Sequence, residues 1–283
     1  MMKAIVITLV LTPLLAFLTA VSEAAPAVNI RSMLASPVDL TVYSVDRKLV
    51  IGHAHFTIKE AGRTVEIIGS TRYGNGEHDW ERIMLEYQQG NPLPAVTSYQ
   101  SNFLAPDGSA QLVEKADAKS GQASCRWGSQ FGDISYEDKL EFGSDAYAGA
   151  SSIVPLQYTL KTGGSSVHFQ VFDCAPKPAL YNIDAKLDDG VAHWAYYPGE
   201  LAKMGLTPDL GWLNLVARPF IPDISVWFDP KEGYQYIGTF KDRFYRGRRQ
   251  VLVRNNPGRA IGTDSAQQTA PSEVANDPAK ASN

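Results

Sequence analysis

This chain of 283 residues is poor in the side chains and motifs on which most catalytic and metal sites depend. It contains two cysteines and five histidines, and it has no nucleophile elbow, phosphate-binding glycine loop, CxxC pair or HExxH motif. Carboxylates are plentiful, but no spacing marks an acid–base pair. We therefore expect a protein that is not an enzyme and holds no cofactor, with a hydrolase of uncatalogued type as a remote alternative.

The N-terminal residues have the pattern of a secretory signal. A short positive start precedes an apolar stretch, residues 4–18, and Ser22 and Ala24 stand at the two positions that a signal peptidase recognises. We expect residues 1–24 to be a signal peptide and the protein to be exported, to the periplasm, with no transmembrane segment after cleavage. The alternative is a retained anchor, against which Pro13 and the small residues at the exit argue.

The other end of the chain is predicted to be a disordered tail. Residues 255–283 contain no aromatic side chain and few branched aliphatic ones, so they cannot bury enough apolar surface to offset the entropy of ordering. Residues 30–254 contain no obvious repeat or linker, which predicts a single β-rich domain. The formal net charge of -4 is too mild to indicate nucleic acid as a partner.

The two cysteines are an even pair in a chain that is expected to leave the cytosol. Exported compartments are oxidising, so a disulfide between Cys125 and Cys174 is predicted. The alternative is two buried free thiols.

Short alternating apolar segments between turns predict an antiparallel sheet. Residues 79–87 also fit helical spacing, but the turn signals on both sides favour a strand. Residues 198–222 are rich in Pro, Gly and Leu and are predicted to be a loop with one helical turn, a candidate lid. The expected strands are residues 38–45, 48–58, 64–73, 79–87, 95–104, 110–117, 123–129, 134–142, 167–172, 179–187, 191–197, 223–229, 234–240 and 248–254.

The stretch 151–174 has two interpretations up to its double glycine. As a hairpin, its apolar residues alternate on both strands. As a helix, Ser152 is the N-cap, Pro155 falls in the first turn and Gly163 follows the last turn. Since the other turns are compact and this one is not, we favour a helix over residues 152–161, followed by a strand.

Three segments carry a resemblance to a known group of proteins: GSTRYGNG (69–76), PLQYTLK (155–161) and SVWFDPKEGYQYIG (225–238). Their order resembles an uncharacterised family of exported bacterial β domains, a domain-of-unknown-function family similar to the half-barrel of the lipoprotein carriers LolA and LolB. The resemblance implies an all-β, or β-rich α+β, fold: a curved antiparallel sheet with one or two short helices on its concave side. It supplies no catalytic residues, and the lipid-attachment cysteine of LolB-type proteins is absent.

A metal site is one hypothesis for His53 and His55. Two residues at i and i+2 on a strand point the same way, with Cα atoms roughly 6.5 to 7 Å apart, which suits two ligands of one zinc or copper ion. Glu77, His78 and Asp79 could supply further ligands. The alternative is a solvated strand face.

A basic cluster occupies residues 241–250 and contains Arg243, Arg246, Arg248 and Arg249. One hypothesis is that it contacts anionic headgroups, glycans or a cell-wall polymer. The alternative is a charged hairpin tip that protects a sheet edge.

Aromatic residues gather in the C-terminal half, and a concave sheet lined by them would hold an apolar or sugar ligand. The leading hypothesis is thus a periplasmic binding or carrier protein for a lipid or other amphiphile. The second is an envelope structural protein that interacts with another envelope protein, in which case the aromatic residues are ordinary core. The candidate ligand-binding residues are Trp194, Tyr196, Trp212 and Trp227.

Overall fold

The structure is a computed structural model that describes residues 28–45, 49–209, 224–245 and 247–255. The predicted signal peptide, Trp212, Arg246 and all of the predicted tail except Asn255 lie outside these residues. In the described part, no helix is long and apolar enough to cross a membrane.

Strands dominate the described chain, as predicted, and residues 79–87 belong to one of them. The strands are β1 (Val38–Ser44), β2 (Val50–Ala61), β3 (Thr64–Tyr73), β4 (His78–Tyr87), β5 (Pro94–Leu104), β6 (Ala110–Asp117), β7 (Gln122–Trp127), β8 (Ser135–Lys139), β9 (Ala146–Ala148), β10 (Ser166–Cys174), β11 (Pro178–Leu187), β12 (Ala192–Trp194), β13 (Tyr197–Pro208), β14 (Ile224–Asp229), β15 (Gln235–Asp242) and β16 (Arg249–Arg254). The helical segments are α1 (Ile30–Met33), α2 (Ile153–Lys161) and the 3-10 turns η1 (Ser129–Phe131), η2 (Gly149–Ser152) and η5 (Pro230–Glu232).

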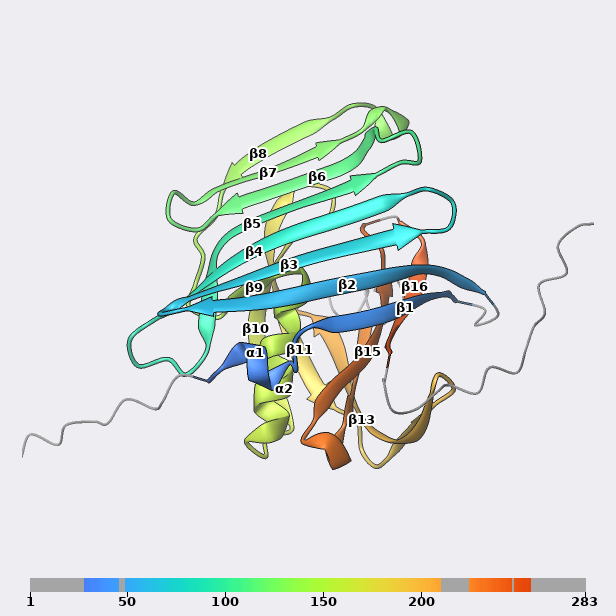
Figure 1. Cartoon of the computed structure of the whole chain (residues 1–283). Helices are drawn as coiled ribbons and strands as arrows, with labels where there is room; N and C mark the ends of the chain where they lie inside the picture. The colour runs from blue at the N-terminus through green and yellow to red at the C-terminus, as the bar shows by residue number, and fades with distance from the viewer. Residues whose placement is uncertain (1–27, 46–48, 210–223, 246, 256–283) are drawn as a thin grey trace, which may run out of the picture.

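The strands form one curved sheet made of two arms. The first arm, β1 to β8, pairs each strand with the next; the second arm, β9 to β16, continues from β1 through its pairing with β16. Figure 1 shows the strands of the second arm crossing behind those of the first at a steep angle. Pairing is antiparallel except between β9 and β10, and β12 lies off the main order, paired with β13.

Alternation along each strand builds the main core between the arms. In β3, Val65 and Ile67 are buried on the concave side, whereas Ile68 and Arg72 face outward. The two arms pack against each other, since β9 contacts β5 and β10 contacts β6. The concave side of the sheet is therefore filled by the protein itself.

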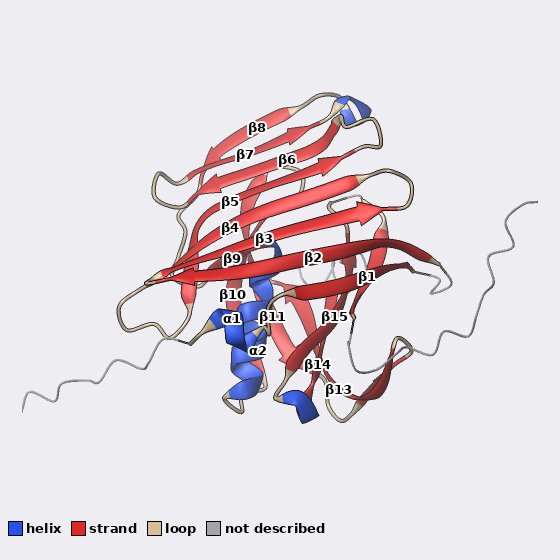
Figure 2. Ribbon diagram, viewed as in Figure 1, coloured by secondary structure: helices blue, strands red, loops and turns tan. Residues whose placement is uncertain are grey.

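Helix α2 confirms the helical interpretation of the stretch after residue 151. Leu156 and Leu160 pack into the core, and Gly163, at φ 80°, follows the last turn, where a left-handed residue ends many helices. Ser152 is the N-cap residue of α2, as predicted, but its side chain makes no capping hydrogen bond, because η2 leads directly into α2 and Ser152 already has helical backbone angles. Figure 2 shows α2 beside α1. The Gln157 side chain of α2 donates a hydrogen bond to the Met33 carbonyl of α1 at 2.8 Å.

The loop prediction for residues 198–222 is wrong over its first half, because residues 197–208 form β13; residues 210–223 lie outside the described part. The strand was hidden because its burial does not alternate: the adjacent residues Leu201 and Ala202 are both buried, whereas Pro198, Glu200 and Thr207 are exposed. Leu201 packs in an outer cluster and Met204 in the main core. Strand β11 pairs with β13 and not with β12, the strand that follows it in the chain.

Candidate functional site

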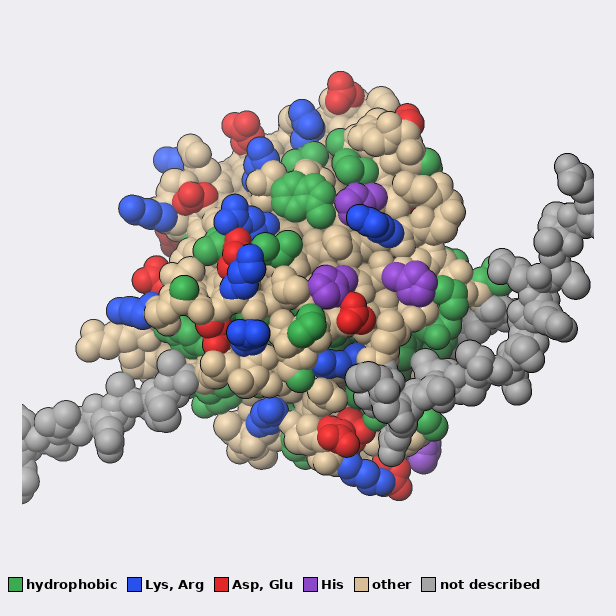
Figure 3. All heavy atoms as spheres, viewed as in Figure 1, with side chains coloured by type: hydrophobic (Ala, Val, Ile, Leu, Met, Phe, Trp, Pro, Cys, Tyr) green, Lys and Arg blue, Asp and Glu red, His purple; other side chains and the backbone are tan. Residues whose placement is uncertain are grey.

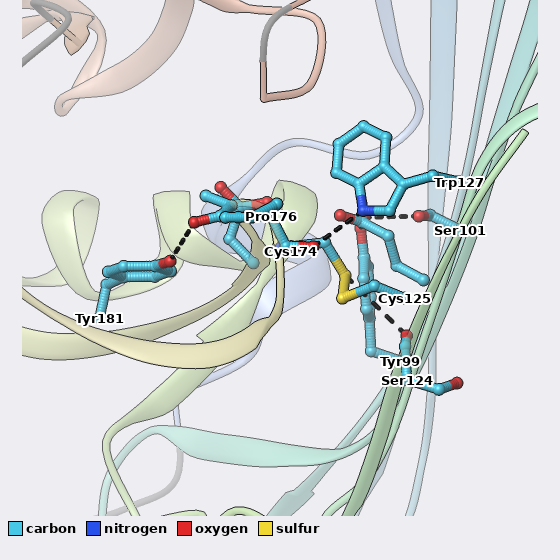
Figure 4. The surroundings of a disulfide bond; sticks show 11 residues. Tyr99, Ser101, Ser124, Cys125, Trp127, Cys174, Pro176 and Tyr181 are labelled. Carbon is cyan, nitrogen blue, oxygen red and sulfur yellow. Dashed lines mark hydrogen bonds between the residues drawn. A yellow bond between two sulfur atoms is a disulfide. The ribbon is translucent and has the colours of Figure 1, made fainter. Parts of the chain in front are cut away.

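A disulfide joins the two arms. Cys125 of β7 and Cys174 at the end of β10 are bonded, as predicted, and both are fully buried. Figure 4 shows the bond beside Trp127, whose indole nitrogen donates to the Pro176 carbonyl at 2.8 Å. Structural disulfides are typical of proteins in oxidising compartments, so this bond agrees with an exported protein.

A polar row crosses the concave face of the first arm next to the disulfide. Strand register places its members side by side on β3 to β7, in the order Gly69, Glu81, Ser101, Glu114 and Cys125. Carboxyl groups at such inward positions are desolvated. Their environment decides whether they act structurally or chemically.

Glu114 lies next to a carboxyl group from the other arm. It is 3% exposed, and it accepts hydrogen bonds from the Tyr99 hydroxyl at 3.0 Å and the Ser101 hydroxyl at 2.7 Å. Burial, with the Asp173 carboxyl of β10 next to it, raises the pKa of Glu114 to about 8. Burial also raises the pKa of Asp173. At neutral pH, Glu114 therefore keeps its proton and donates it in a hydrogen bond to Asp173.

Glu81 lies against the start of the helical segment. A Cβ atom on Gly69 would lie 2.9 Å from the Glu81 Cγ, so the glycine leaves room for this side chain. The Ala150 amide donates to the Glu81 carboxylate at 3.4 Å. Burial raises the pKa of Glu81, and the positive charge of Lys241 partly offsets the increase.

These interior carboxyls connect the arms. Buried acids with raised pKa values are candidates for acid–base catalysis when a cleft admits a substrate. Here Ile83 and Tyr99, in the next row of the same face, are buried, as is Cys125 beside Glu114. We therefore assign the carboxyls to the packing of one arm against the other.

A second buried network gathers around Arg243, in the connection between β15 and β16. The side chain is 5% exposed and binds Asp79 through Nε, 2.9 Å from Oδ2, and through Nη2. Its Nη1 lies 2.8 Å from both the Glu77 carboxylate and the Gln111 side-chain oxygen. The Tyr73 hydroxyl donates to Asp79 at 3.0 Å. The prediction that Arg243 contacts an anionic surface is wrong, because its charge is neutralised inside the protein.

The other described arginines of this basic cluster also have acidic partners. Arg248 pairs with Glu77 at 2.8 Å and lies over the Tyr73 ring, 4.1 Å from its centroid. Arg249 pairs with Asp242 at 3.0 Å. Asp242 lies within the basic cluster itself, whereas Glu77 comes from the turn before β4, so the basic segment by itself did not reveal the partner of Arg248.

Three of the predicted ligand-binding aromatics come together, but on the convex side. The rings of Trp194 and Trp227 stack 4.2 Å apart at an interplanar angle of 4°, and Tyr196 packs on Trp194 at 5.2 Å. Each of the three is 6–7% exposed. They form an outer core with Val251 and Val253, separate from the core between the arms. No open aromatic surface is left by these residues.

The outward face of β2 to β4 carries a row of nitrogen-bearing side chains. Register places His53, Arg72 and His78 side by side across the three strands, and we call them the cationic row. His55, in the adjacent row, lies 2.7 Å from Asp39. Figure 3 looks onto this face, where histidine side chains lie open at the surface.

A shallow groove with a volume of about 630 Å³ runs along this face. The side chains that line it are polar on the outward positions, and its floor is formed by β1, β2 and β3. The lining residues are Asp39, Leu40, His53, Ala54, His55, Ser70, Arg72 and Asn255.

The histidine pair does not gain the further metal ligands that the sequence suggested. Glu77 and Asp79 are bonded to Arg243 on the concave side, and His78 is separated from His53 by Arg72. Across the described residues, no group of three or more His, Cys, Asp and Glu side chains is arranged to hold a metal ion.

Comparison with protein-family models gives no match, and comparison with curated protein sequences gives none either. Among solved structures, the chain is similar to the crystal structure of a beta-barrel-like protein of domain of unknown function DUF1849 from Brucella abortus. The identity is 9%, the TM-score is 0.42, and the match covers 77% of this chain and 94% of that chain. Similarity at this level does not indicate a function for the chain.

Proposed function

We propose that this is an exported, non-catalytic envelope protein that binds its partner on the outward face of the first arm. The observation that carries the proposal is the filled concave side. The space in which an apolar ligand would be carried is taken up by α2 and by the second arm, with residues such as Leu156, Phe169 and Phe172 fully or almost fully buried. A carrier of the half-barrel type needs that space empty.

The groove along β1 to β3 supports the outward face as the binding surface. Its lining includes an exposed arginine, two histidines and Asp39, side chains that can bind a polar or charged partner. Export is supported by the signal-like N-terminus and by the buried disulfide.

The test is co-sedimentation of the purified mature protein with isolated cell-envelope material. We expect the wild-type protein to sediment with the envelope and the double variant His53→Ala/Arg72→Ala to remain in solution. Arg126→Ala, which removes an exposed arginine from β7 of the same arm, serves as the matched control and should behave as wild type.

Native mass spectrometry separates this proposal from the carrier hypothesis. We expect the mass of the chain alone. A stoichiometric lipid that co-purifies and is retained in the gas phase would overturn the proposal.

A further inference from the structure

We infer that the cationic row, together with Trp80 beside it, binds a saccharide that carries a phosphate group. This inference rests on the proposed function, because it names the chemistry of the partner on the same face.

The positive charge on this face is concentrated at Arg72. Two other charged side chains on this face have partners: Arg82 lies 2.7 Å from Glu66, and His55 lies 2.7 Å from Asp39. Arg72 is exposed, and among the described residues no carboxylate lies within ion-pair distance of it. An exposed guanidinium between two histidines disfavours a metal cation and favours an anion.

The geometry of the row suits phosphate. Neighbouring strands lie about 4.8 Å apart, so the row spans roughly 10 Å with Arg72 in its centre. Arginine binds two phosphate oxygens with its planar fork, and an imidazole N–H on either side can donate to another oxygen. The oxygens of a phosphate point in several directions, so each of the three side chains can reach an oxygen of its own.

Trp80 supplies the surface for the sugar. It lies on the same outward face of β4, two residues from His78 and directly beside Ser70 of β3. The Trp80 side chain is partly exposed. With the Asn102 amide oriented so that both its oxygen and its nitrogen have partners, the Asn102 oxygen accepts a hydrogen bond from the Trp80 indole nitrogen at 2.9 Å. The diagonal distance from Trp80 to Arg72 is within reach of long side chains. The C–H face of a pyranose ring packs on an indole in this way, while its phosphate reaches the arginine.

The test is isothermal titration calorimetry of the full mature protein with three probes: glucose 6-phosphate, inorganic phosphate and glucose. We expect glucose 6-phosphate to bind more tightly than either of the other two. Arg72→Ala should weaken both glucose 6-phosphate and inorganic phosphate by about tenfold or more, a loss of about 1.4 kcal/mol. Trp80→Ala should weaken glucose 6-phosphate and leave inorganic phosphate unchanged.

Arg126→Ala is the control for a general loss of positive charge, and a thermal unfolding midpoint for each variant checks that it folds. The inference is overturned if glucose 6-phosphate does not bind at millimolar concentration, if inorganic phosphate binds as tightly, or if Arg126→Ala weakens binding as much as Arg72→Ala. If any of these results is found while the wild-type protein still sediments with envelope material, the sugar-phosphate inference fails and the proposed function stands. If sedimentation is lost as well, both fail.

Discussion

Glu114 and Asp173 face one another across the two arms, and each is next to one half of the disulfide. Glu114 is the cross-strand neighbour of Cys125, and Asp173 precedes Cys174 in the chain. The disulfide therefore joins β7 to β10, and beside it a shared proton joins β6 to β10. The two links respond to different conditions, one to reductant and one to pH.

The proton link predicts how stability depends on pH. Glu114 keeps its proton in the folded protein up to about pH 8, whereas in an unfolded chain a glutamate loses it near pH 4.3, that is about 4 pH units lower. Between these values the folded state holds more protons, so the free energy of unfolding falls as pH rises.

Glu114→Gln removes this titration and keeps a donor for Asp173 and an acceptor for Tyr99 and Ser101. At pH 8 we expect the variant to exceed wild type in stability by on the order of 2 kcal/mol, with a flatter pH profile in urea unfolding from pH 5 to 8. The exposed Glu137→Gln of β8 is the matched control. An unchanged pH profile in Glu114→Gln would show that the pair does not share a proton.

The buried ion pair of Arg243 and Asp79 predicts a large cost when one partner is removed. Arg243→Met leaves the Asp79 carboxylate buried without its cation, and we expect a loss of about 3–5 kcal/mol in urea unfolding. Adding Asp79→Asn should recover part of that loss. Arg82→Ala, which breaks the exposed pair with Glu66, should cost about 1 kcal/mol or less. Equal costs for the two single arginine variants would contradict this account.

The disulfide closes a loop with a sequence separation of 49 residues. In the chain-entropy model a loop of this length contributes about 4 kcal/mol. We expect Cys125→Ala/Cys174→Ala to lose roughly that amount in guanidinium unfolding and to become insensitive to reductant, whereas reduction of the wild-type protein should reproduce the loss. A wild-type protein equally stable with and without reductant would refute a stabilising role for the disulfide.

The stacked pair of Trp194 and Trp227 predicts a structural role. Trp194→Ala opens the outer core, and we expect a loss of about 3 kcal/mol together with a change in tryptophan fluorescence. Val191→Ala, at a residue that is 58% exposed just before β12, should change stability by less than about 0.5 kcal/mol. A Trp194→Ala variant as stable as the wild-type protein would contradict the structural role of this ring.

Local patterns made much of the fold predictable. Alternation identified the strands of the first arm, and the early proline and the glycine stop identified α2. The even pair of cysteines indicated the disulfide. In each case the signal lies within a few residues of the element, or in composition, because periodicity and turn chemistry are local properties.

The features that could not be predicted depend on residues far apart in the chain. Strand β13 does not alternate, because its adjacent residues Leu201 and Ala202 pack in different cores, and nothing within the strand indicates the outer core. Arg243 has the sequence surroundings of a surface charge, and its buried partner Asp79 lies 164 residues earlier in the chain. The cationic row exists only through strand register, which places His53, Arg72 and His78 in line.

The pairing of β1 with β16 brings Leu40 opposite Arg254. One neighbour of β1, the strand β2, follows it directly in the chain, but the other is the last strand of the described protein. The pairing of β1 with β16 in the middle of the sheet can therefore form only when both of these strands, which lie near opposite ends of the described chain, are present. Contacts of such long sequence separation slow folding, so we expect the sheet to be completed only when β16 is available to pair with β1.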